Sequence, residues 1–256
     1  MTMGYVVTGG GQGIGRAIVE RLLVDGGHVV AVDSNPAALS WTSAHPHADR
    51  LVAFPGSAAD EEAMTRAANL AQQRAPLAGW VNNAAVFEDA SLHLAPAAKI
   101  SETIRRNLDV VVVGSSAAVR HFLAGGTGGA IVNLSSWQAR LAVPGALPYS
   151  TAKAAIEGLS RALAVEYGPA GIRVNVVAPG SVDTARYQAY LQTQGAEGAA
   201  KIEAEMARLH PLGRVAKASE VAAAVAFLLG PDASFVNGVV PPVDGGRSAL
   251  GRDPEG

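Results

Sequence analysis

The chain of 256 residues is 49% apolar and 16% charged, so it can bury a sizeable core and shows no composition typical of disorder. A formal net charge of −2 supplies no basic surface for nucleic acid and no polybasic patch for a membrane. Cysteine is absent, which excludes disulfides and thiolate catalysis, and the six histidines form no pattern of metal ligands. We expect one cytoplasmic domain over residues 1–256, because no signal peptide precedes the first strand and no run of about 18 apolar residues could cross a bilayer.

A glycine-rich turn follows the first predicted strand, residues 4–8, and opens the first predicted helix. Gly9, Gly13 and Gly15 lack side chains, so the backbone there can approach a pyrophosphate whose charge faces the free N–H groups of the helix start. The alternative is an ordinary tight turn between a strand and a helix. The order of strand, glycines and helix favours nucleotide binding.

The second predicted strand, residues 28–33, ends at Asp33. A carboxylate at this position can accept hydrogen bonds from an adenosine ribose. Asp33 could instead cap the turn that continues into Asn35 and Pro36, which is also a reasonable reading. The preceding glycines favour ribose binding.

Further short apolar runs predict strands at residues 51–54, 79–83, 130–135 and 172–178. The helices predicted between and after them start at residue 60 and cover about residues 100–123, 149–166 and 219–229. This alternation predicts a doubly wound α/β domain of the Rossmann type, with a mostly parallel sheet of about seven strands and helices on both faces. Residues 183–212 show no strand pattern, and residues 247–256 are expected to form a loose tail.

Tyr149 and Lys153 lie four residues apart in a predicted helix, so their side chains share one helix face. A free tyrosine has a pKa of about 10, and an adjacent cation lowers it, which would make the phenol a usable general acid and base. Lys153 also belongs to a charge stripe with Glu157 and Arg161, which usually marks a solvated helix face. Together with the N-terminal glycines, the tyrosine and lysine point to hydride transfer on a dinucleotide.

The sequence resembles the short-chain dehydrogenase/reductase family from about residue 4 to residue 246. Taken singly, Asn82 could be a turn residue, Asn107 a surface residue and Ser136 a cap, but their joint occurrence favours the family. The landmarks that match in order and spacing are the glycine turn, Asn82-Asn83-Ala84-Ala85, Asn107, Ser136, Tyr149 with Lys153, Pro179-Gly180 through Thr184, and Asp244-Gly245-Gly246.

The resemblance implies a role for each matching residue. Tyr149 would be the general acid and base, Lys153 would lower its pKa and hold the nicotinamide ribose, and Ser136 would bind the substrate oxygen. Asn107 would kink its helix and hold a water for proton relay, while Gln138 would reach the substrate pocket. The residues expected to contact the cofactor are Gly9, Gln12, Gly13, Ile14, Gly15, Asp33, Ser57, Ala58, Asn82, Ala84, Tyr149, Lys153, Pro179, Gly180, Val182 and Thr184.

Two positions depart from the family pattern. Ala85 stands where the family commonly has glycine, which is a minor change. The family usually contacts the adenine with an acidic residue followed by a small apolar one, and this chain offers Ser57-Ala58 instead. Either Ser57 or Asp60 could make that contact, and Asp60 could be only a helix cap.

The predicted function is reversible hydride transfer between NAD and a secondary alcohol or ketone. NAD is preferred over NADP because Asp33 would face a 2′-phosphate with like charge, while Ser34, Asn35 and Gln12 supply no offsetting cation. Two other classes stay open: a nucleotide-binding regulator without turnover, and an epimerase or dehydratase that oxidises its substrate transiently.

The sequence leaves the substrate open. The indole of Trp137 and the amide of Gln138 are suited to binding a small-molecule substrate such as a sugar, a polyol or a ring alcohol. The alternative is that Trp137 only packs in the protein core. Residues 185–209 are expected to close over the substrate as a mobile lid. The resemblance also implies a homotetramer, and the small residues on the helices around 100–123 and 150–167 would permit close packing between subunits. We expect no nucleic-acid or membrane partner.

Overall fold

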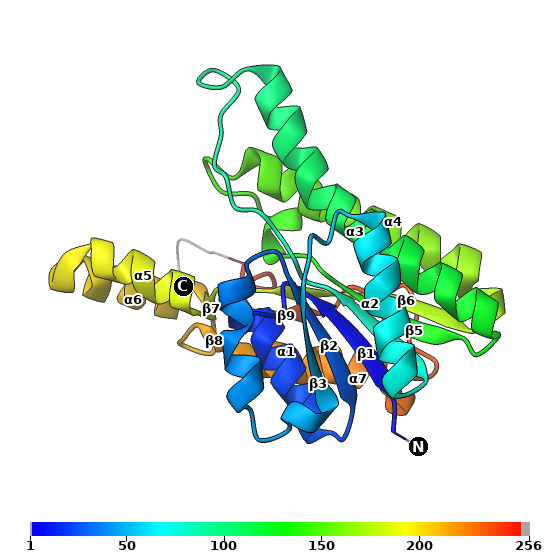
Figure 1. Ribbon diagram of the computed structural model, residues 1–256. Coiled ribbons are helices and arrows are strands. Elements are labelled where there is room, and N and C mark those ends of the chain that lie inside the picture. The colour runs from blue at the N-terminus through cyan, green and yellow to red at the C-terminus, as the bar shows by residue number, and fades with distance from the viewer. Residues whose placement is uncertain (1, 252–256) are drawn as a thin grey trace.

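The computed structural model describes residues 2–251 and has one large sheet at its centre (Figure 1). Its seven strands are all parallel and follow the order β3-β2-β1-β4-β5-β6-β9. The chain therefore first adds β2 and β3 on one side of β1, and then adds β4, β5, β6 and β9 on the other side. The predicted doubly wound fold is therefore confirmed. The strands are β1 (Gly4–Thr8), β2 (His28–Asp33), β3 (Leu51–Pro55), β4 (Leu77–Asn82), β5 (Gly129–Leu134), β6 (Ile172–Pro179) and β9 (Pro242–Val243).

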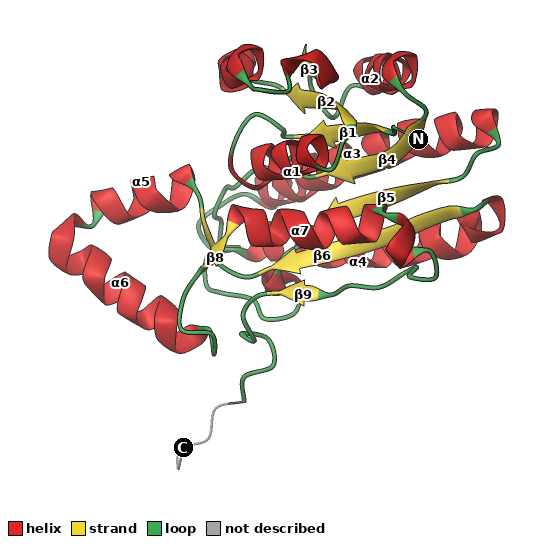
Figure 2. Ribbon diagram, turned by 90° about the horizontal axis from the view of Figure 1, so that it is seen from below, coloured by secondary structure: helices red, strands yellow, loops and turns green. Residues whose placement is uncertain are grey.

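Helices cover both faces of the sheet (Figure 2). On one face α1 (Gly13–Val24) packs against α7 (Ala218–Leu229), and on the other lie α2 (Glu61–Arg74), α3 (Ala97–Gly125) and α4 (Leu147–Tyr167). Successive residues of a strand point to opposite faces. Val6 is therefore buried with the α2–α4 layer, whereas Val7 is buried with α1 and α7.

The segment without a strand pattern forms two helices that project from the sheet (Figure 2). These are α5 (Ala185–Thr193) and α6 (Gly195–Leu209), and among their residues only Leu191 is buried. The flanking residues form a separate two-stranded parallel sheet of β7 (Val182–Asp183) and β8 (Ala216–Lys217). We call α5 and α6 together the helical arm. The sequence showed only the missing strand pattern here and no helix was predicted, although α6 is amphipathic.

Helix α3 meets the length and composition criteria of a membrane-spanning helix, although the sequence has no long unbroken apolar run. It is the one helix within residues 2–251 that does so, and core helices often meet the same criteria. In this fold α3 packs against α2, α4 and β4. Those contacts explain its apolar composition.

The loose tail predicted for residues 247–256 is wrong in its first part. The Ser248 N–H donates to Asp244 Oδ2 at 2.9 Å, and the Arg247 guanidinium donates to Ser181 Oγ at 3.2 Å. These bonds fix the chain after β9 beside the end of β6. The final residues of the predicted tail lie outside the described part of the chain.

A buried polar network crosses the sheet near the carboxyl ends of β4 and β5. Asn82 Nδ2 donates to Asn133 Oδ1 at 2.8 Å and to Ser115 Oγ at 3.0 Å, while Asn82 Oδ1 accepts from Trp80 Nε1 at 2.8 Å. Asn133 in turn donates to Ser160 Oγ at 2.9 Å. The network joins two strands to α3 and α4, and each bond satisfies a polar group that water cannot reach.

Replacing Asn82 with Ala should lower the free energy of unfolding by about 3 kcal/mol or more, because Trp80, Ser115 and Asn133 each lose a partner in the core. Chemical denaturation measures this loss. The control is Asn69→Ala on the exposed face of α2, which should change stability by less than about 0.5 kcal/mol. Equal stability of the two variants would contradict a structural role for the network.

Candidate active site

The glycine turn between β1 and α1 is bound to the end of β4. Asn83 Nδ2 donates to the carbonyl oxygens of Thr8 at 3.1 Å and Gly9 at 3.0 Å, and Thr8 Oγ1 accepts from the Asn83 N–H at 3.1 Å. Gly9 and Gly13 have φ angles of 64° and 55°, a left-handed conformation that glycine adopts without strain. A Cβ on Gly15 would overlap Gly9 O, so this glycine lets α1 approach the turn closely.

A cleft of about 1170 Å³ runs along the carboxyl ends of the strands and reaches the helical arm. It is lined by most of the residues that the sequence predicts for cofactor and substrate, although they come from seven separate segments of the chain. The predicted residues that line it are Gly9, Gln12, Gly13, Ile14, Asp33, Ser57, Ala58, Ala84, Ser136, Gln138, Tyr149, Lys153, Pro179, Gly180, Val182 and Thr184.

Three predicted residues do not line the cleft: Gly15, Asn82 and Asn107. The polar side-chain atoms of Asn82 are already used in the buried network, and its adenosine contact stays a prediction. Asn107 is 1% exposed, with Oδ1 accepting from the Val86 N–H at 2.9 Å and Nδ2 donating to Thr103 O at 3.0 Å. It ties the segment after β4 to α3, which runs as one helix through this point. Its water relay and the kink stay predictions.

At the adenosine end, Asp33 lines the cleft and also organises the turn after β2. Its Oδ2 accepts from the Gly11 N–H at 3.1 Å and its Oδ1 accepts from the Asn35 N–H at 3.0 Å, so the capping role weighed from the sequence is present as well. Arg16 does not line the cleft. Its guanidinium pairs with Glu20 at 2.8 Å on the surface of α1.

The carboxylate of Asp60 caps α2 and does not line the cleft. Its Oδ1 accepts from the Glu62 N–H at 2.9 Å and from the Ala63 N–H at 3.0 Å. Ser57 and Ala58 lie in the cleft wall instead. Of the two residues proposed for the adenine contact, Ser57 is therefore the one in position.

Lys153 faces the sheet. It is 3% exposed, its Nζ donates to Leu134 O at 2.7 Å, and Nζ lies 5.4 Å from the centroid of the Tyr149 ring. Glu157 is 6% exposed and its Oε1 accepts from Ser135 Oγ at 3.2 Å. A solvated charge stripe is therefore wrong for these two residues, because α4 packs this face against the end of β5.

Burial sets the acidity of the two central groups. Burial raises the pKa of Tyr149 to about 12, while a hydrogen bond with Ser136 and the positive charge of Arg186 oppose the rise. Burial also lowers the pKa of Lys153 to about 8. The expected lowering of the Tyr149 pKa is wrong in direction, because removal from water disfavours the phenolate more than the Ser136 hydrogen bond and the Arg186 charge favour it. At pH 7 the phenol is a neutral proton donor and the lysine is still charged.

Two aromatic rings shape the substrate end of the cleft. Phe87 stacks on Tyr149 with 4.9 Å between ring centroids, and Trp137 is 9% exposed, with the Arg247 guanidinium carbon 3.6 Å above its ring. Trp137 therefore both packs and lines the cleft. Phe87 and Arg247 were not predicted, because neither belongs to a local sequence motif. Only the tertiary fold brings these two residues to the cleft.

Two polar groups complete the substrate end. Ser136 caps the short turn after β5, with its Oγ accepting from the Gln138 N–H at 3.2 Å. The buried Oε1 of Gln138 has no hydrogen-bond partner within residues 2–251. A buried acceptor without a partner costs free energy, so Gln138 is suited to accept a hydrogen bond from a substrate hydroxyl.

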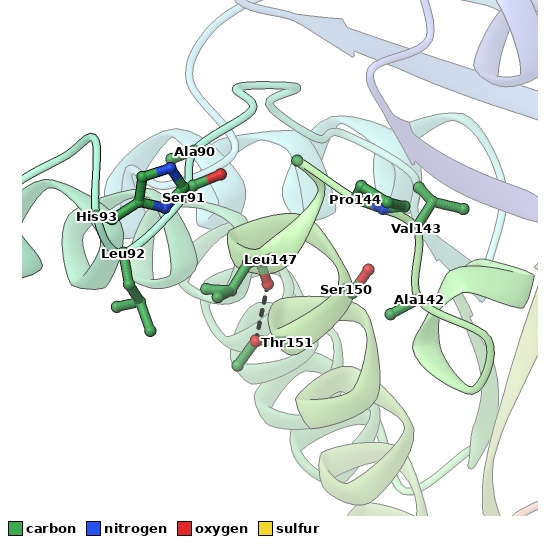
Figure 3. Close-up of a pocket in the computed structure, with 11 residues that line it drawn as sticks. Ala90, Ser91, Leu92, His93, Ala142, Val143, Pro144, Leu147, Ser150 and Thr151 are labelled. Atoms are coloured by element: carbon green, nitrogen blue, oxygen red, sulfur yellow. Dashed lines mark hydrogen bonds between the residues drawn. The ribbon is translucent and has the colours of Figure 1, made fainter.

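A second cavity of about 450 Å³ adjoins the cleft (Figure 3). It lies between the segment 90–93 and the loop 142–145, and it shares Val143 and Pro144 with the main cleft. Thr151 Oγ1 at its edge donates to Leu147 O at 2.8 Å. The shared loop separates the two spaces, so its position affects the width of both.

The main cleft fits a dinucleotide. Its volume exceeds the roughly 300–1000 Å³ of ordinary small-molecule sites. The N-terminus of α1, whose first N–H groups lack partners within the helix, lies at the glycine turn and suits a pyrophosphate. Asp33 would hold the adenosine ribose and Lys153 the nicotinamide ribose. No group of three or more metal-binding side chains occurs in the described part of the chain.

Comparison with known proteins identifies the family. Residues 9–248 match the family model described as enoyl-(acyl carrier protein) reductase. The sequence is 33% identical to 2-(R)-hydroxypropyl-CoM dehydrogenase of Xanthobacter autotrophicus, over 96% of this chain and 98% of that one. The chain belongs to the short-chain dehydrogenase/reductase family.

Two further relatives bear on substrate and cofactor. The chain is 36% identical to cis-4-hydroxycyclohexanecarboxylate dehydrogenase of Sinomonas cyclohexanicum, over 96% of each chain. Its fold matches the structure of ElxO with NADP bound, with a TM-score of 0.85 and 25% identity over 98% of this chain and 100% of that one. This dehydrogenase/reductase family therefore includes neighbours with different substrates and with the phosphorylated cofactor.

The lowered pKa of Lys153 predicts how stability depends on pH. Its pKa is about 8 in the folded protein and ordinarily 10.5, so the unfolded chain binds more protons between these values and this residue makes stability rise with pH there. The wild type should gain up to about 3 kcal/mol relative to Lys153→Met between pH 8 and 10.5. Urea unfolding at several pH values measures the difference. Lys201→Met, at an exposed site, should show no such trend. Parallel pH curves for wild type and Lys153→Met would contradict the assignment.

Proposed function

We propose that this protein is an NAD-dependent dehydrogenase that moves a hydride reversibly between the cofactor and a secondary alcohol or its ketone. The observation that carries the proposal is the meeting of Tyr149, Ser136 and Lys153 at one end of a cleft that fits a dinucleotide. The family's curated members and solved structures support oxidoreduction at a CH–OH group. Retention of all these groups argues against a regulator without turnover.

The side chains divide the proton chemistry between them. In reduction, the neutral Tyr149 phenol donates its proton to the carbonyl oxygen, and the Ser136 hydroxyl donates a hydrogen bond to the same oxygen as negative charge develops. In oxidation the proton returns from the alcohol to the Tyr149 phenolate. A bound nicotinamide supplies or accepts the hydride. Lys153, held by Leu134 O, keeps a positive charge beneath the phenol and favours the phenolate when it forms.

A preference for NAD is supported by the adenosine end of the cleft. The Asp33 carboxylate would repel a 2′-phosphate, and the next cleft residues, Ser34 and Asn35, carry no charge. Arg16, the basic residue nearest in sequence to the glycine turn, pairs with Glu20 and does not line the cleft. Repulsion without a compensating cation disfavours NADP.

A ring alcohol or sugar is the proposed substrate class. The apolar faces of Phe87 and Trp137 would pack on a ring, and Gln138 offers a buried acceptor to a hydroxyl. The curated relative that acts on 4-hydroxycyclohexanecarboxylate supports a cyclic secondary alcohol. The helical arm, which lines the cleft through Tyr187 and Tyr190, is proposed to close over the bound substrate.

A cytoplasmic homotetramer is the proposed assembly and location. The packed helices α3 and α4 leave Val112, Leu123 and Val165 exposed, which supports a subunit interface on this side of the molecule.

Tyr149→Phe keeps the ring that stacks on Phe87 and removes only the proton donor. Turnover of cyclohexanol or 4-hydroxycyclohexanecarboxylate should fall by roughly 100-fold or more, with the dissociation constant of NADH changed little. Absorbance of reduced cofactor and NADH fluorescence measure the two quantities. Tyr167→Phe, at the far end of the same helix, is the matched control and should keep its turnover. Wild-type turnover by Tyr149→Phe would exclude the proposed acid and base.

Asp33→Ala combined with Ser34→Arg should shift the cofactor preference toward NADP. The change removes the repelling carboxylate and adds a cation next to the expected 2′-phosphate, so the ratio of kcat/KM for NAD over NADP should fall by roughly 100-fold or more. The single variant Ser34→Arg separates the added cation from the lost carboxylate. If the unmodified protein uses both cofactors with equal kcat/KM, Asp33 does not select between them.

A further inference from the structure

One arginine in the cleft wall lies over the ring of Phe87, the aromatic neighbour of Tyr149. The guanidinium carbon of Arg186 is 3.7 Å from the centroid of the Phe87 ring, and Phe87 in turn stacks on Tyr149 at 4.9 Å. All three residues line the same cleft. A positive charge on an exposed side chain therefore lies at the substrate end, with the Phe87 ring between it and Tyr149.

Arg186 has no counter-ion in the part of the chain that the structure describes. Within residues 2–251 its guanidinium makes no ion pair within 4.0 Å and no hydrogen bond. The acidic side chain nearest to it in sequence, Asp183, accepts instead from Gln188 Nε2 at 2.6 Å. A guanidinium presents five N–H donors in a planar fork that matches a carboxylate, and the exposed Arg186 directs these donors to no described protein group.

The other arginines of the cleft behave differently. Arg105 pairs with Asp109 at 3.0 Å and Arg106 pairs with Glu88 at 2.7 Å, so the charges of both are offset within the protein. Arg247 donates to Ser181 Oγ at 3.2 Å and helps to fix the chain end. Among the arginines of the cleft within residues 2–251, Arg186 is thus the one whose donors are directed to no described protein group.

The surroundings of Arg186 are suited to a substrate with two parts. The rings of Phe87 and Tyr149 offer an apolar surface for a carbon skeleton, whereas the guanidinium offers charge and donors at its edge. The charge of Arg186 is also felt at the reacting end, since it opposes the rise in the Tyr149 pKa. An anion held there would be near the reactive carbon.

We propose that the substrate is a secondary alcohol that also carries an anionic oxygen group, such as a carboxylate, and that Arg186 binds this group. The inference rests on the proposed dehydrogenase function and specifies its substrate class. Binding through a charged, bidentate hydrogen bond would select anionic alcohols over neutral ones of the same shape. The competing assignment is a contact between Arg186 and the phosphates of the cofactor, because Arg186 follows the expected nicotinamide contact Thr184 by two residues.

The test compares ligands of the same shape with and without charge. Calorimetry measures binding of cyclohexanecarboxylate and cyclohexanecarboxamide to the NAD-saturated protein, and kinetics compares 4-hydroxycyclohexanecarboxylate with its carboxamide. The wild type should prefer the carboxylate by about 10- to 100-fold in both measurements. Arg186→Met should abolish this preference, and Arg186→Lys, which keeps the charge without the fork, should retain part of it.

Arg105→Met is the matched control, because it removes the same cation from the same cleft wall at a position already paired with Asp109. It should keep the preference for the carboxylate. Equal binding of the two ligands to the wild type, or equal loss in both variants, would overturn the proposal and leave the dehydrogenase function intact. A higher dissociation constant for NAD in Arg186→Met, without loss of the preference, would assign Arg186 to the cofactor. If the preference holds but no alcohol is oxidised, the anion site stands and the proposed function fails.

Discussion

The fold depends on one close approach, where the glycine turn after β1 meets the end of β4. Asn83 donates to two carbonyl oxygens of that turn, and Thr8 accepts from the backbone of Asn83 in return. The contact lies where the winding of the sheet changes side, and it leaves the N–H groups of α1 facing the cleft. Glycine is required at Gly9 and Gly15 because any Cβ would occupy space that this contact uses.

Burial of Tyr149 and Lys153, at the substrate side of the cleft, sets the acidity of the site. Because Tyr149 and Lys153 are removed from water, one is held as a neutral acid and the other as a cation close to losing its proton. The carbonyl oxygen of Leu134 fixes the lysine beneath the ring. A site of this kind favours proton transfer coupled to hydride transfer, since the charge that develops on oxygen meets donors already in place.

The substrate end is built from parts of the chain that are far apart in sequence. Phe87 follows β4, Trp137 follows β5, Arg186 begins the helical arm and Arg247 follows β9. Two arginines lie over two aromatic rings, so apolar surface and positive charge alternate along the wall. The helical arm buries only Leu191, so few buried contacts oppose the closure proposed for it.

The sequence by itself determined the parallel sheet, the glycine turn and the pairing of Tyr149 with Lys153, because each follows from the spacing of nearby residues or from the periodicity of apolar residues. It did not determine that the Asn82 side chain joins a buried hydrogen-bond network, that Glu157 is buried or that the helical arm forms. Nor did it determine the direction of the Tyr149 pKa. The tertiary structure decided these points, because burial and hydrogen bonds between distant segments depend on what packs over a residue. Arg186 shows the same limit: its place beside Phe87 and Tyr149 follows from three separate segments meeting at one edge of the sheet.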